Sequence, residues 1–187
     1  MSDVLFHYTS KYHLAKILKT GYLKLTESNL LKPVSYADAL PKPDSQLHKP
    51  VVWLTRTETP VGNGLEGCLF NKYEIRLTFH KRENYIPWLV WSRNNRINKS
   101  WAKMLERGNN PNAWYVSEQI VPLNAGELVW IENTVTGETI IDIAAGVKAC
   151  EIKIEKPDSI SSKHIAAIDN FLKDAGLNLN DTVSFAA

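Results

Sequence analysis

A histidine at a predicted junction between a strand and a helix is the residue best placed for chemistry in this sequence. Residues 4–6 are an apolar run that favours a buried strand, and His7 follows directly. Thr9 or Ser10 can cap the helix predicted over residues 11–20. The free N–H groups and partial positive charge at a helix N-terminus suit a phosphate or another anion. We therefore expect His7 to lie at the end of the strand, beside a site for an anionic ligand.

A second stretch, residues 85–107, interleaves aromatic and basic side chains. Aromatic rings can stack on exposed nucleic-acid bases, at roughly 1–3 kcal/mol per base, while cations follow the phosphates. The alternative is that the tryptophans pack in the core beneath a basic surface, and the sequence leaves both open. The residues concerned, as candidates for binding a macromolecule, are Trp88, Trp91, Arg93 and Arg96.

Composition favours a single folded domain. The chain has 187 residues, of which 44% are apolar, and its formal net charge of +2 is too small to indicate a polyanionic partner. Cys68 and Cys150 have no spacing typical of a disulfide framework or a zinc site, so no metal is expected. The N-terminus does not resemble a signal peptide, and no apolar run is long enough to span a bilayer. We expect a cytoplasmic protein with no membrane partner.

The elements that must position these residues are short strands with few helices, an α+β pattern. Residues 73–79 alternate apolar and polar types, which predicts one buried and one polar face. Residues 27–49 are expected to be an irregular loop, and the tail from Asn178 to be loosely held. One domain is predicted over residues 1–187, with a C-terminal helix and tail over 160–187. The remaining strands are expected at residues 22–26, 51–55, 113–121, 127–133, 138–143 and 149–154.

The first stretch also carries a family resemblance. His-Tyr-Thr-Ser from His7, then Leu-x-x-Ile-Leu-x-x-Gly ending at Gly21, then Leu-x-Leu-Thr ending at Thr26, resembles the opening of ADP-ribosyltransferase-like domains. The similarity is greatest to the branch that includes the DarT-type toxins, which modify DNA. The resemblance implies a split core of two small antiparallel sheets with an N-terminal and a C-terminal helix.

The resemblance implies that the chain binds NAD as a consumed substrate, without a metal. His7 would donate a hydrogen bond to the adenosine-side ribose, and Thr9 would help to hold the same dinucleotide. Tyr8 belongs to the same nucleotide-binding motif, although strand alternation turns its side chain the opposite way and favours a structural role.

A later strand supplies three further candidates for nucleotide binding. Many members of the superfamily place a tyrosine near the nicotinamide, whereas this chain has Trp53. Trp53 can stack on a flat ring or serve as a core aromatic residue. Thr55 would line the cleft, and Arg56 would pair with a phosphate.

Glu118 is the carboxylate that the resemblance implies as catalyst. Breaking the bond between nicotinamide and ribose creates positive charge on the sugar, which a carboxylate stabilises. Val116 replaces the first acid of the paired motif found in arginine-modifying members, which disfavours arginine as acceptor. DarT-type members place their glutamate earlier on the strand, where this chain has Trp114, so Glu127 and Glu132 are the alternative carboxylates.

These features predict a mono-ADP-ribosyltransferase that acts on a macromolecule, with DNA or RNA favoured over protein. An antitoxin or another regulatory partner would fit such an activity. The alternative is a non-catalytic module that binds a nucleotide or a protein partner on the same scaffold. Transfer of an RNA 2′-phosphate ranks last, because that chemistry uses several Arg and His residues and only His7 and Arg56 are evident.

Overall fold

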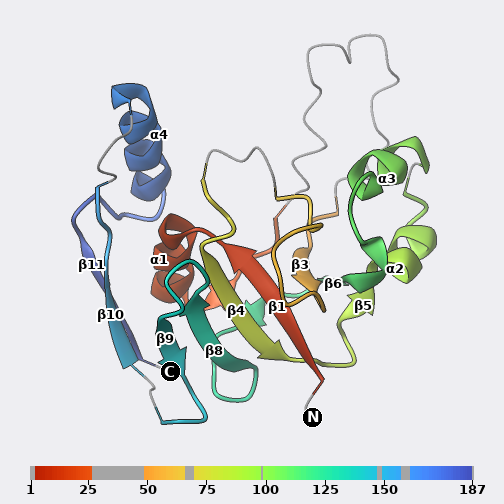
Figure 1. Cartoon of the computed structure of the whole chain (residues 1–187), viewed down its shortest axis with the longest axis horizontal. Coiled ribbons are helices and arrows are strands. Elements are labelled where there is room, and N and C mark those ends of the chain that lie inside the picture. The colour runs from red at the N-terminus through yellow and green to blue at the C-terminus, as the bar shows by residue number, and fades with distance from the viewer. Residues whose placement is uncertain are drawn as a thin grey trace.

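A seven-stranded antiparallel sheet forms the centre of the fold (Figure 1). The computed structural model describes residues 3–26, 49–65, 70–97, 99–146, 149–156 and 161–186, so most of the loop expected over residues 27–49 lies outside the described residues. Across the sheet the strands follow the order β5 (Ile86–Pro87), β6 (Trp114–Ser117), β3 (Val52–Thr55), β1 (Val4–Thr9), β4 (Ile75–His80), β8 (Leu128–Asn133) and β9 (Thr139–Asp142).

The predicted strand and helix at the start of the chain are both present. Helix α1 (Lys11–Thr20) begins after Ser10, whose side chain accepts a hydrogen bond from the backbone N–H of His13, and ends at Gly21 with a φ of 77°. Strand β1 continues to Thr9, so His7 lies inside the strand and not at its end as predicted. The reason is that Tyr8 and Thr9 are themselves buried and paired with β4.

The two faces of the sheet bury different groups of residues. Because side chains alternate along a strand, Leu5, Leu54, Leu77 and Ile131 point to one face, where helix α1 covers them. The opposite face of β3 and β6 carries a second cluster of buried side chains, formed with helices α2 (Trp88–Asn94) and α3 (Lys99–Glu106).

Strand β4 is buried on both faces, whereas the sequence predicted one buried and one polar face. Arg76 and Thr78 have exposed fractions of 8% and 0%, comparable with those of Ile75, Leu77 and Phe79. The strand lies between β1 and β8 in the interior of the sheet, so its polar residues are enclosed by neighbours on both sides.

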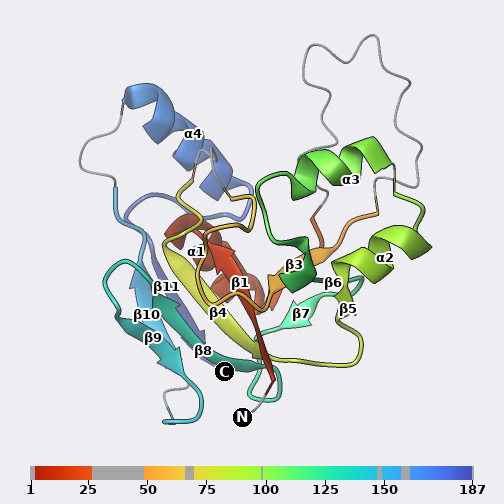
Figure 2. The same cartoon turned by 45° about the vertical axis from the view of Figure 1, so that its right-hand side comes forward.

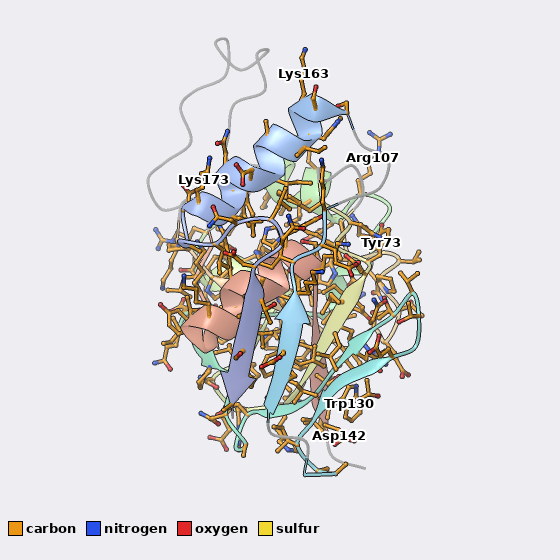
Figure 3. The ribbon with its side chains drawn as sticks, turned by 90° about the vertical axis from the view of Figure 1, so that its left-hand side faces the viewer. Tyr73, Arg107, Trp130, Asp142, Lys163 and Lys173 are labelled. Atoms are coloured by element: carbon orange, nitrogen blue, oxygen red, sulfur yellow. The ribbon has the colours of Figure 1, made fainter. Side chains whose placement is uncertain are left out.

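The C-terminal tail is an ordered strand, and the expectation that it is loosely held was wrong. Strand β11 (Thr182–Ala186) pairs with β10 (Ala149–Lys153) along its full length, and its Val183 and Phe185 are buried. Figure 3 shows this pair of strands lying across α1. Helix α4 (Ser162–Lys173) precedes β11 and buries Ile168 and Leu172, as the predicted C-terminal helix should.

The strand predicted over residues 113–121 is divided in two. After β6, the chain bends at Glu118, where the Ser117 hydroxyl donates to the Gln119 carbonyl and accepts from the Gln119 N–H. It then forms β7 (Val121–Pro122), which pairs with β2 (Tyr22–Leu23) outside the large sheet. A 3-10 turn, η4 (Pro111–Ala113), comes before β6.

The central sheet is weakly joined at one place. Among the described residues, Phe6 opposite Thr55 is the one pair in register between β1 and β3, whereas every residue of β1 pairs with β4. The α+β class is thus confirmed, with one large antiparallel sheet and few helices. Instead of two small sheets, the described strands form one large sheet and two two-stranded sheets, β10-β11 and β2-β7.

Candidate functional site

His7 lies where β1 and β3 separate, and its ring is anchored there. Its Nδ1 atom is 2.8 Å from the carbonyl oxygen of Trp53. Burial lowers the pKa of His7 to about 4, an effect that the hydrogen bond to Trp53 opposes and the charge of Lys72 reinforces. The ring is therefore neutral at pH 7. Because a carbonyl only accepts, Nδ1 carries the proton and Nε2 is an acceptor.

This tautomer reverses the expected role of His7 towards a ribose. A neutral ring that donates through Nδ1 to Trp53 has no second N–H, so Nε2 can only accept a hydrogen bond from a hydroxyl group. Among the described residues, Nε2 has no hydrogen-bond partner. In this tautomer the ring could accept a hydrogen bond from a ribose hydroxyl but could not donate the one predicted from the family resemblance.

The surroundings of His7 contain a second histidine and a lysine. His13 faces the start of α1, with its Nδ1 2.8 Å from the Ser10 hydroxyl and its ring 5.1 Å from that of Phe70. Burial lowers the pKa of His13 to about 3, and the charge of Lys72 acts in the same direction. Burial is thus the main cause of both shifts, and Lys72 adds a cation near the two neutral rings.

Three of the predicted nucleotide-binding side chains are buried and engaged within the protein. The Tyr8 hydroxyl donates to the backbone carbonyl of Glu58. The Thr55 hydroxyl accepts from the backbone N–H of Thr57 at 3.1 Å. Thr9 is 3% exposed and Thr55 4% exposed. The structural role considered for Tyr8 agrees with these contacts, and Thr9 and Thr55 present little surface to a ligand.

Arg56, in contrast, is accessible and shares a face of the sheet with His7. Phe6 and Thr55 pair in register, so their side chains point to one face of the sheet. Because side chains alternate, His7 points to the other face, and so does Tyr115, which pairs with Leu54. The Arg56 guanidinium lies 5.0 Å from the centre of the Tyr115 ring and 3.6 Å from Asp3, with nearly half of its side chain exposed. It is therefore available to a phosphate on that face.

The tryptophans predicted as a base-stacking platform are core residues. Trp88 and Trp91 have exposed fractions of 3% and 4%, and their rings stack on each other at 5.7 Å. Trp53 lies 4.9 Å from Trp88 and joins the same cluster, as does Trp114. These rings cannot stack on a nucleic-acid base. The alternative, in which they pack beneath a basic surface, is the one observed.

The basic residues of the same segment do reach solvent. Arg93 and Arg96 are exposed at the end of α2 and just beyond it, and Arg96 has a positive φ of 53°. They are positioned as predicted, but without exposed tryptophans beside them.

Glu118 is held by two donors at the end of β6. Its Oε1 atom lies 2.6 Å from Lys49 Nζ and accepts from Trp91 Nε1 at 2.7 Å. The pKa of Glu118 is lowered first by the hydrogen bond from Lys49 and then by that from Trp91, against a smaller effect of burial. The carboxylate is therefore ionised at pH 7, and about a third of the side chain is exposed.

His7 and Glu118 do not face each other. Glu118 bonds to Trp91, whose cluster packs on the face of β3 and β6 that carries Trp53 and Trp114. His7 points to the opposite face. The predicted pairing of this imidazole and this carboxylate across one groove is thus incorrect, because the register of β1, β3 and β6 places residues 114, 116 and 118 on the face opposite His7.

The alternative carboxylates are also committed to neighbours. Glu127 lies 3.2 Å from Arg82 Nε and accepts from the Tyr85 hydroxyl at 3.2 Å. Glu132 lies 2.7 Å from Arg76. Neither contacts His7.

A buried polar cluster on β4 and β8 was not predicted. Arg76 binds Glu132 and the Glu58 carbonyl, and three buried atoms, Arg76 Nε, Thr78 Oγ1 and Trp130 Nε1, have no hydrogen-bond partner among the described residues. Trp130 pairs with Thr78 of β4 on one side and with Asp142 of β9 on the other. Trp130 and Asp142 are labelled in Figure 3. The alternating sequence of β4 does not distinguish a buried arginine at position 76 from an exposed one.

Comparison with known proteins adds no family assignment. No family model matches the chain, and no curated protein or solved structure does so either. The part of the chain that the structure describes contains no group of three or more His, Cys, Asp or Glu side chains able to hold a metal ion. In that same part, no helix has the length and apolar character needed to cross a membrane.

Proposed function

We propose that this protein binds NAD on an ADP-ribosyltransferase-like scaffold, through His7 and Arg56. The observation that carries the proposal is the His7 ring, held neutral by burial, anchored through Nδ1 to Trp53 and left with Nε2 as an acceptor. A ribose hydroxyl is the matching donor. Arg56, exposed on the same face, supplies the cation for the pyrophosphate.

The single register pair between β1 and β3 supports a split core of the ADP-ribosyltransferase type. It divides the seven strands into a group of three, β5-β6-β3, and a group of four, β1-β4-β8-β9. His7 stands at the junction, and its side chain bonds to the backbone of the other group. A ligand bound to His7 would therefore contact the junction between the two groups.

Replacement of His7 with asparagine tests this binding mode. The amide N–H of asparagine can replace Nδ1–H as donor to Trp53, while the Nε2 acceptor is removed. We expect NAD affinity to fall about threefold to tenfold, the usual effect of one hydrogen bond, in a calorimetric titration. Lys163→Ala, on exposed α4, is the control and should leave affinity unchanged. The proposal is contradicted if the natural protein does not bind NAD, or if His7→Asn binds NAD with the same affinity as the natural protein.

Transfer of ADP-ribose from NAD to a macromolecule is the second candidate function. One observation favours it: β1 and β6 both run antiparallel to β3, so their C-terminal ends, which carry Thr9 and Glu118, lie at the same end of the sheet. Glu118 is ionised and partly exposed there. Because Glu118 and His7 lie on opposite faces, transfer to DNA, RNA or protein by Glu118 requires the nicotinamide end of NAD to extend around this end of the sheet.

Labelled NAD distinguishes transfer from binding alone. If Glu118 is catalytic, Glu118→Gln should reduce label on DNA, RNA or protein about 100-fold or more, as loss of an electrostatic stabiliser does. Glu106→Gln is a matched control, because Glu106 likewise accepts from a tryptophan of the cluster, Trp88, at 2.8 Å. Equal loss in both variants, or transfer that survives Glu118→Gln, removes Glu118 from the reaction. NAD binding without any transfer supports the non-catalytic module.

A further inference from the structure

Helix α3 presents a row of cations to solvent. Lys99 and Lys103 are four residues apart, and Arg107 follows at the same spacing just beyond the helix, which aligns the three on one side. Ala102 and Leu105 face inward and pack against the tryptophan cluster. The exposed row is therefore fixed in orientation by the buried side of the same helix.

No carboxylate among the described residues neutralises this row. Glu106 is the one acidic residue in the sequence from 88 to 107, and its carboxylate is bound to Trp88 Nε1. Like charges four residues apart on a helix destabilise it. The helix thus keeps a repulsive arrangement that a negatively charged partner would relieve.

Exposed aliphatic side chains are found on α3 and on the neighbouring helix α2. Met104 is 67% exposed on α3, and Leu89 and Val90 are 37% and 46% exposed on α2. The two helices lie next to each other in both views, at the end of the fold away from α4 (Figures 1 and 2). We call the six side chains together the α2–α3 surface: Leu89, Val90, Lys99, Lys103, Met104 and Arg107.

We propose that the α2–α3 surface binds an acidic protein segment that also carries aliphatic side chains. The cations match carboxylates, and Met104 with Leu89 and Val90 matches apolar side chains that would otherwise stay in water. Exposed ion pairs contribute little individually, so the apolar contacts are needed for affinity. A nucleic acid fits less well, because base stacking needs exposed aromatic rings and Trp88 and Trp91 are buried. This inference does not depend on NAD binding.

The probe for this surface is a fluorescent synthetic peptide of about 20 residues, with glutamate and leucine at helical spacing. Its binding to the full chain is followed by fluorescence anisotropy. A thymidine oligonucleotide of equal length and vesicles of phosphatidylglycerol are the comparison ligands. Charge reversal by Lys99→Glu with Lys103→Glu should weaken peptide binding about tenfold or more, and Met104→Ser about threefold to fivefold. Lys163→Glu, a charge reversal on α4, should change it less than about twofold.

Three results would overturn the proposal. The first is tighter binding of the oligonucleotide than of the peptide, with Met104→Ser without effect, which indicates a nucleic-acid surface. The second is tighter binding of the vesicles, which indicates a membrane surface. The third is no peptide binding up to about 1 mM, the weak end of useful affinity. The circular dichroism spectrum of each variant must match that of the natural protein. If the double charge reversal does not fold, Met104→Ser still tests the surface, because Met104 is largely exposed.

Discussion

Replacing Arg76 with alanine is expected to lower the free energy of unfolding by about 3–5 kcal/mol, nearer 3. The Arg76 side chain is 10% exposed and lies 2.7 Å from Glu132, which is itself 23% exposed. It donates to the Glu58 carbonyl at 2.6 Å, and its guanidinium lies 4.9 Å from the centre of the Phe6 ring. Its removal leaves a largely buried carboxylate and carbonyl without their donor. The lower value is expected because Glu132 keeps some contact with water.

Urea denaturation followed by tryptophan fluorescence measures this loss. Lys173→Ala is the matched control, since it breaks the exposed Lys173–Asp169 pair at 3.0 Å, and should cost less than about 1 kcal/mol. Arg76→Met with Glu132→Gln should recover part of the stability lost in Arg76→Met alone, because the stranded charge is then gone. A loss in Arg76→Ala no larger than that in Lys173→Ala would show that the β4–β8 ion pair contributes little.

Acidification is expected to destabilise the fold between pH 6.5 and about 4, by about 3 kcal/mol through His7. Burial lowers the pKa of His7 to about 4, whereas the unfolded chain takes up the proton at the ordinary value of 6.5. Each tenfold difference in proton affinity is worth about 1.4 kcal/mol. The stability is fully present above pH 6.5 and falls as the pH drops, because the unfolded state then binds a proton that the folded state does not. His13 acts in the same direction, since its pKa is lowered to about 3.

Urea midpoints measured at several pH values between 4 and 7 test this dependence. His7→Asn should reduce the slope in that interval and leave the part due to His13, because asparagine keeps a donor for the Trp53 carbonyl and does not titrate. His164→Asn, at an exposed position on α4, is the control and should keep the slope of the natural protein. A slope that is unchanged in His7→Asn would mean that the ring is already accessible to protons in the folded state.

The local signals in the sequence predicted the first elements well. The Ser10 cap, the helix that follows and the Gly21 end depend on residues a few positions apart, and all three are present. The same is true of the β8–β9 hairpin and of α4. The α+β class follows from these short-range patterns, because hydrophobic periodicity and turn residues act within a window of the chain.

The candidate site depended on contacts that no local pattern encodes. The pattern of aromatic and basic residues over 85–107 identified α2 and α3 as unusual, but only packing against β3 and β6 decided that Trp88 and Trp91 are buried and that lysines face solvent. Likewise, the alternation in β4 was correct, yet its polar residues are enclosed because β1 and β8 flank the strand.

By itself, the sequence placed His7 on the first strand beside α1 and Glu118 within a later strand, which the structure ends at Ser117. The tertiary structure decided which way each side chain points. The register of β1, β3 and β6 places the two residues on opposite faces of the sheet, and the bond from Trp91 holds Glu118 on the face of the tryptophan cluster. The physical reason is the two-residue period of a strand: Phe6 pairs with Thr55 and Thr55 with Trp114, so residues 114, 116 and 118 lie on the face opposite His7. That register joins strands distant in the chain, and no local pattern encodes it.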